Sequence, residues 1–173
     1  MKERVLLLQF KPKPMKILSS IFSALLVFSL LSVTSCSKEK ESNTVAPDYL
    51  VFGHFYGMCA GELCVETFML TESDLYEDSN DSYSAQEPFE MVRMTNENFE
   101  KARDLTDYIP SELLNDNEDR YGCPDCGDQG GLLVILSVDG VVRKWRIDQS
   151  KVSIPVFLHE FVDELNERIA LLE

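Results

Sequence analysis

The chain has 173 residues, of which 45% are hydrophobic and 27% charged, values typical of a globular protein rather than a disordered or fibrous one. The 16 Lys and Arg residues and 30 Asp and Glu residues give a net charge of −14, which argues against general nucleic-acid binding because phosphate contacts need clustered cations. Five basic residues and one acid give residues 1–35 a net charge of +4, which leaves −18 for the rest. Two differently charged segments therefore follow one another.

An apolar segment at residues 17–31 follows Lys16 and is broken only by four serines. About 20 apolar residues are needed to span a bilayer, so this run is short for a transmembrane helix but typical of the core of a signal peptide. Met15 directly precedes Lys16, and we therefore expect translation to start at Met15 rather than at Met1. Residues 1–35 are predicted to hold the signal peptide, and an uncleaved anchor is the alternative.

Val33-Thr34-Ser35-Cys36 directly follows the apolar segment. An aliphatic residue, two small residues and a cysteine in this order resemble the lipobox of bacterial lipoproteins. The resemblance implies that Cys36 is acylated and becomes the new N-terminus. A lipid bilayer is then the expected partner, because two or more acyl chains anchor a protein stably where one does not.

Residues 36–48 are predicted to be the lipidated cysteine and a flexible tether, because they are polar and lack apolar periodicity. The stretch rich in Ser, Lys and acids after Cys36 is similar to that of lipoproteins of Bacteroidota, in which such stretches promote surface display. This resemblance implies an outer-membrane lipoprotein of the cell envelope that faces the periplasm or the cell surface. Residues 49–173 are expected to form a single globular domain.

The globular part contains short runs of aromatic and β-branched residues, which favour strands. Residues 71–87 are acidic and rich in Ser and Asn, so we expect a loop there. Asp139-Gly140 between two apolar runs is the strongest short-range signal for a β-hairpin. Strands are expected at 49–58, 64–70, 89–94, 132–138 and 141–147.

Two helices are expected. Thr95 is a suitable N-cap for the first helix, which Pro110 ends or kinks. The second begins at about Pro155, and its apolar residues form one stripe at helical spacing: Leu158, Phe161, Val162, Leu165, Ile169 and Leu172. The order ββ(β)αββα predicts an α+β fold, a two-layer sandwich in which an antiparallel sheet of four to five strands carries both helices on one face.

Four cysteines remain beyond Cys36, an even number in a chain expected to be exported, which favours disulfides. Cys59 and Cys64 lie where the strands of one predicted hairpin meet its loop, and cross-strand partners are close enough for a disulfide. Cys123 and Cys126 are separated by two residues and can also pair with each other. Local pairing is therefore our preferred prediction.

Zinc binding and thiol redox chemistry are the two alternatives. Cys123-Pro124-Asp125-Cys126 and the following glycine resemble the knuckle of zinc ribbons, and Cys59 and Cys64 would supply the other two ligands. The C-x-x-C spacing is also that of thioredoxin-like proteins, but glycines and a strand follow here instead of a helix. Asp125 would also raise the pKa of a nearby thiol.

The sequence contains no phosphate-binding loop, nucleophile elbow or H-E-x-x-H helix. The acidic stretches 74–81 and 115–119 suggest calcium, but neither has EF-hand spacing, and solvated loops explain them better. His54 lies among aromatic residues and His159 beside the apolar stripe, and we expect both to be structural. We therefore predict a small non-catalytic binding or envelope-associated domain without a cofactor, with a protein or a glycan as ligand.

Overall fold

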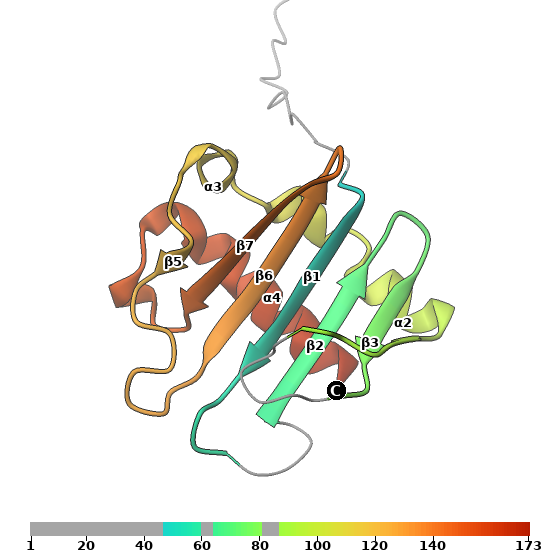
Figure 1. Ribbon diagram of the computed structural model, residues 1–173, viewed down its shortest axis with the longest axis horizontal. Coiled ribbons are helices and arrows are strands. Elements are labelled where there is room, and N and C mark those ends of the chain that lie inside the picture. Colours follow the sequence, from blue (N-terminus) through green and yellow to red (C-terminus); the bar gives the residue numbers. More distant parts are fainter. Residues whose placement is uncertain (1–46, 60–63, 81–86) are drawn as a thin grey trace, which may run out of the picture. The chain divides into compact units, whose positions relative to one another are not determined.

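The computed structural model describes residues 47–59, 64–80 and 87–173. The predicted signal peptide, Cys36 and most of the predicted tether lie outside the described residues. The described part of the chain has an α+β fold, as the order of the predicted elements indicates (Figure 1).

Seven strands form one sheet in the described part, in the order β4-β3-β2-β1-β6-β7-β5. The neighbouring strands pair antiparallel except β5, which runs parallel to β7. The sheet is therefore mixed and larger than the four to five antiparallel strands predicted. The strands are β1 (Tyr49–Phe55), β2 (Val65–Leu70), β3 (Leu75–Asp78), β4 (Met91–Arg93), β5 (Arg120–Tyr121), β6 (Gly131–Val138) and β7 (Val141–Asp148).

The two strands that the sequence pattern did not predict, β3 and β5, are short. The β3 strand lies inside the segment 71–87 that was expected to be a loop, and it pairs with β2 and β4. The β5 strand has only two residues at the edge of the sheet. Runs of four and two residues carry little periodic signal of their own, and pairing with β2, β4 and β7 holds both strands in the sheet.

Three α-helices occur among the described residues rather than the two predicted: α2 (Asn96–Ala102), α3 (Ser111–Asn115) and α4 (His159–Leu172). The N-cap prediction for α2 is confirmed, because the Thr95 side chain accepts a hydrogen bond from the Asn98 amide. A 3-10 turn follows at Leu105–Tyr108, and Pro110 then caps the short α3 instead of ending a longer helix. Pro suits that position since it has no amide hydrogen to leave unpaired.

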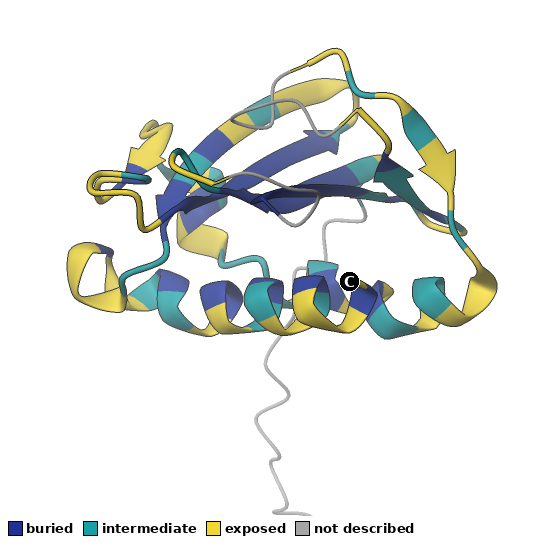
Figure 2. Ribbon diagram, turned by 90° about the horizontal axis from the view of Figure 1, so that it is seen from below, coloured by how far each residue is buried: buried dark blue, intermediate teal, exposed yellow. Residues whose placement is uncertain are grey.

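The helices form a layer on one face of the sheet, as predicted (Figure 2). Phe161, Leu165 and Ile169 of α4 belong to the same buried apolar cluster as Phe52 of β1 and Trp145 of β7. All six residues of the predicted stripe are buried. The apolar stripe therefore makes the main core of the fold.

The opposite face of the sheet, called the outer face below, carries a second and smaller apolar cluster. Successive residues of a strand point to opposite faces, so the neighbours of the β1 core residues point outward. Val51 and Phe55 of β1 join Val65 of β2 and Leu133 and Ile135 of β6. Since β6 is buried on both faces, its sequence GLLVILSV is almost continuously apolar.

The hairpin between β6 and β7 is confirmed at Asp139-Gly140. Both residues have positive φ, 51° and 75°, as a two-residue type I′ turn requires. Asp48 supports this turn, since its Oδ2 accepts hydrogen bonds from the Gly140 amide and the Ser137 hydroxyl at 2.9 and 2.8 Å.

Candidate functional site

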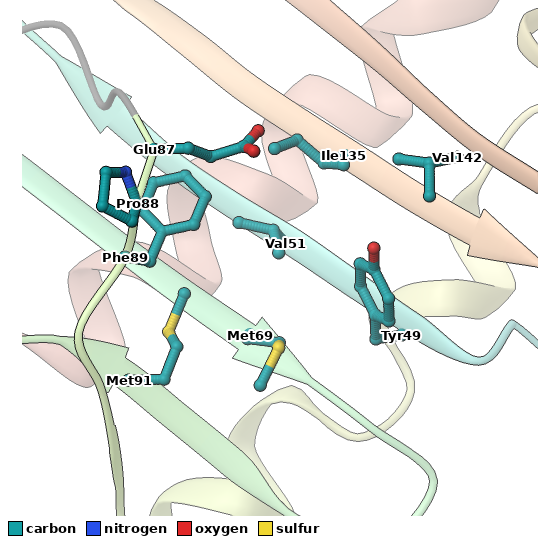
Figure 3. A pocket seen from close by; sticks show the side chains of 9 residues that line it. All are labelled: Tyr49, Val51, Met69, Glu87, Pro88, Phe89, Met91, Ile135 and Val142. Carbon is teal, nitrogen blue, oxygen red and sulfur yellow. The ribbon is translucent and has the colours of Figure 1, made fainter. Parts of the chain in front are cut away.

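The outer face contains an apolar groove with a volume of about 670 Å³. Its lining comes from β1, β2, β4, β6, β7 and the segment 87–90, called the strap below. Figure 3 shows how these side chains surround it. The nine lining residues are Tyr49, Val51, Met69, Glu87, Pro88, Phe89, Met91, Ile135 and Val142.

Sheet pairing places the floor of the groove. Val51 of β1 lies between Met69 of β2 and Ile135 of β6 in the register of the sheet, so three neighbouring strands present apolar side chains side by side. Tyr49 and Val142 lie farther along the same face, and Figure 3 shows them together at one end. The floor is therefore rigid, because each of its strands is paired on both sides.

The strap forms one wall of the groove above this floor. Phe89 of the strap and Met91 of β4 pack against the cluster of Val51 and Ile135. The strap is fixed to the end of β3, where Asp78 Oδ1 accepts a hydrogen bond of 2.6 Å from the Glu90 amide. Asp78 is buried, and this hydrogen bond compensates part of the cost of burying its carboxylate.

Two polar groups occur in this lining, the Tyr49 hydroxyl and the Glu87 carboxylate. The Glu87 Oε1 lies 3.5 Å from Nζ of Lys144, and both side chains are largely exposed. An exposed pair of this kind contributes little to stability. A concave and mainly apolar site with few polar groups is typical of a small-molecule binding site.

A cationic corner adjoins the groove on the same face. Arg120 of β5 and Lys144 and Arg146 of β7 line a hollow of about 230 Å³ together with Asp119. The guanidinium carbon of Arg146 lies 4.6 Å from the ring centre of Phe55, a cation–π contact. Burial and the positive charge of Arg120 lower the pKa of the Arg146 guanidinium.

The four cysteines form two local disulfides, Cys59–Cys64 and Cys123–Cys126, with Cα–Cα distances of 5.6 and 5.4 Å. This confirms the preferred pairing. The two loops that carry them are joined, since Asp125 Oδ1 accepts a hydrogen bond of 2.9 Å from the Gly57 amide. The loop of Cys123 is also held by Asp148, whose Oδ2 accepts from the Cys123 amide at 2.9 Å.

The structure pairs the cysteines that the zinc and redox alternatives would use. No group of three or more His, Cys, Asp or Glu side chains among the described residues is placed to hold a metal ion, and the four cysteines are paired as disulfides. Carboxylates of the proposed calcium loops bind protein groups instead: Asp74 binds Arg93 and Asp116 binds Tyr121. The segment after Cys126 leads into β6 without a helix, as the sequence indicated.

Both histidines take structural positions. His54 is buried on the helix side of β1, with its Nε2 3.6 Å from Oε1 of Glu173, the residue that follows α4. His159 begins α4, and its Nε2 lies 3.4 Å from the Ile154 carbonyl oxygen. Neither residue lines the groove on the outer face.

No protein family, curated protein or solved structure that was compared with the chain matches it. Within the described residues, no helix combines the length and apolar character needed to cross a membrane. The site is therefore interpreted from its geometry and chemistry alone.

Sequence reasoning did not identify the groove or the cationic corner. One signal was present in β7, where Val142, Lys144 and Arg146 alternate with Arg143 and Trp145. That alternation predicts two different faces, but it does not tell which face carries the helices. The groove also needs the strap, whose course depends on tertiary contacts.

Proposed function

We propose that the protein is a membrane-anchored lipoprotein whose folded part is a non-catalytic module that binds an apolar ligand. The apolar groove on the outer face is the observation that carries the binding proposal. Its volume lies within the range of about 300–1,000 Å³ that small-molecule sites occupy. Burying the hydrocarbon surface of a ligand against this lining would stabilise the complex by about 25 cal/mol for each Å² removed from water.

The chemistry of the groove favours an apolar ligand over a glycan. Hydroxyl groups that lose water need hydrogen-bond partners, and the lining offers two polar side chains, Tyr49 and Glu87. Met69 and Met91 instead supply flexible and polarizable side chains that adapt to apolar shapes. These residues support a ligand with a hydrocarbon or aromatic body.

Anchoring is proposed from the sequence. The lipobox-like segment ending at Cys36 and the polar residues after it support a lipid-anchored protein of the outer membrane. Its bilayer partner would be reached through acylated Cys36, and the module at residues 49–173 would lie at the end of the tether. A binding module fixed at a membrane surface meets apolar molecules that have very low concentrations in water.

Val142→Asp tests the binding proposal. The Val142 side chain is 55% exposed, so its replacement is tolerated by the fold, but it lines the groove and a carboxylate there would oppose an apolar ligand. We expect the affinity for the neutral fluorescent probe N-phenyl-1-naphthylamine to fall about tenfold or more. Equilibrium fluorescence titration of the purified protein measures it.

Val141→Asp is the matched control. Val141 is the neighbouring residue of β7, is 65% exposed and points to the opposite face of the sheet. The same substitution there should leave probe binding unchanged. Equal affinities for the probe in the two variants would contradict binding in the groove.

A further inference from the structure

Three cations of the outer face, Arg120, Lys144 and Arg146, gather at one end of the groove, although the chain as a whole has a net charge of −14. Lys144 lies opposite Ile135 in the register of β6 and β7, and Ile135 belongs to the groove lining. Val142, also in the lining, is two residues from Lys144 on the same strand face, which is about 7 Å along a β-strand. The groove and the cationic corner are therefore continuous along β7.

The corner places like charges close together. Arg120 and Arg146 are direct partners in the parallel register of β5 and β7. Arg146 is held against the Phe55 ring, so its guanidinium has a defined position. Mutual repulsion and partial burial both oppose the charge of Arg146, as the lowered pKa of its guanidinium indicates. A bound anion would favour the charged form of the Arg146 guanidinium.

The charges of the corner favour a monoanion. Arg120, Lys144 and Arg146 supply three positive charges, and the nearby carboxylates of Asp119 and Glu87 supply two negative charges. The Asp148 carboxylate follows Arg146 on the same face of β7 and accepts hydrogen bonds from the Cys123 and Ser150 amides, so the net charge of the corner is at most +1. A charge this small complements a carboxylate better than a phosphate dianion. Arginine side chains also present paired N–H donors that match the two oxygens of a carboxylate.

We propose that the groove and the cationic corner together bind a single-chain amphiphile with a carboxylate head, of the chemical class of the fatty acids. This inference rests on the proposed function and adds to it the charge and polarity of the ligand. The hydrocarbon chain lies over Val142, Ile135 and Val51, and the carboxylate lies toward Lys144, Arg146 and Arg120. The carboxylate replaces Glu87 as the partner of Lys144.

Competition against N-phenyl-1-naphthylamine tests this inference with three probes of equal chain length: decanoate, decanol and decyl phosphate. The purified protein should release the fluorescent probe at a decanoate concentration about tenfold or more below that of decanol, because hydrogen bonds between charged groups are stronger than those of a neutral hydroxyl. Decyl phosphate should compete less well than decanoate. A stronger effect of decyl phosphate would overturn the assignment of a carboxylate head.

The double variant Arg120→Gln with Lys144→Gln removes two of the three cations and keeps polar side chains at exposed positions. We expect it to lose the preference for decanoate while it still binds decanol. Arg103→Gln is the matched control, since Arg103 is an exposed cation that pairs with Glu100 at the end of α2, and it should keep the preference.

The outcomes separate the two proposals. A decanoate preference that persists in the double variant, or equal competition by decanoate and decanol in the unaltered protein, overturns the anionic amphiphile while an apolar ligand remains. Failure of the neutral probe to distinguish Val142→Asp from Val141→Asp overturns the proposed function itself.

Discussion

Single carboxylates organise much of the backbone outside the helices. Asp125 accepts hydrogen bonds from the amides of Gly57 and Gly130, and Asp148 accepts from those of Cys123 and Ser150. Each carboxylate joins two backbone positions from different parts of the chain and satisfies amides that no strand partner reaches. Asp125 and Asp148 therefore have specific structural roles outside the acidic stretches that were expected to be solvated loops.

Asp48 provides a pH-dependent test of this role. Hydrogen bonds from the Gly140 amide and then from the Ser137 hydroxyl lower the pKa of Asp48 below its ordinary value of 3.8. A lowered pKa stabilises the folded state above the unfolded pKa, and this contribution is lost as the pH falls through the folded pKa. We expect Asp48→Asn to make the urea midpoint fall less steeply between about pH 5 and pH 3.

Chemical denaturation of both proteins across this pH range measures the difference. Asp74 and Asp116 also have lowered pKa values, so the variant should retain part of the acid sensitivity. Identical pH profiles for the variant and the unaltered protein would show that the Asp48 contacts do not stabilise the fold.

The secondary-structure elements differ in how well they can be predicted from their own residues. The stripe of α4 and the Asp139-Gly140 turn are local patterns, and both predictions are confirmed. Thr95 also caps α2 as expected. The β3 and β5 strands could not be predicted, because their own runs are four and two residues long and too short to show a periodic pattern.

The candidate site was less predictable than the fold, because it is assembled from segments that lie far apart in the sequence. Its lining comes from five strands and the strap, so no window of the sequence contains it. The cysteine pairs, in contrast, were predictable because each closes a short loop: the two cysteines are five positions apart in one pair and three in the other. Local geometry was enough to choose between the three pairings that four cysteines allow.

Loss of the Cys59–Cys64 disulfide should lower stability without unfolding the protein. A short loop restrains the unfolded chain modestly, so we expect Cys59→Ser with Cys64→Ser to reduce the free energy of unfolding by about 2 kcal/mol. The main core of α4 and the sheet does not include these residues. Thermal denaturation followed by circular dichroism should show a lower Tm and a native spectrum at room temperature.

A metal site would behave differently, because metal binding energy is part of the folding energy. A chelator should therefore leave the unaltered protein unchanged. Unfolding of the double variant at room temperature, or a loss of structure on chelation, would contradict the structural role assigned to this disulfide.

The whole protein combines two parts with different tasks in the proposed account. Residues 1–48 are predicted to direct export and to anchor the protein, and residues 49–173 carry the fold and the groove. The chain after residue 35 is strongly acidic, whereas three cations, Arg120, Lys144 and Arg146, converge at one end of the groove on the outer face. The net charge of the chain alone does not show this local cluster of cations.

Cys36→Ala tests the anchoring part. Without the thiol no acyl chain can be attached, so we expect the variant to remain unprocessed or to leave the membrane fraction. Cell fractionation with measurement of the apparent mass distinguishes these results from normal processing. Cys36→Ala protein that stays in the membrane fraction at the unaltered mass would show that the lipobox interpretation is wrong.

The central claim is that the groove on the outer face binds the apolar ligand, and the methionine methyl groups report on it directly. Met69 and Met91 line the groove, whereas Met58 is 80% exposed in a loop and Met94 packs against the main core on the helix side. NMR of the ¹³C-methyl-methionine protein, assigned by single Met→Leu variants, should follow a decanoate titration. The account predicts saturable shifts at Met69 and Met91 with little change at Met58 and Met94. Shifts confined to Met58 or Met94, or no saturable shift at Met69 and Met91, would contradict it.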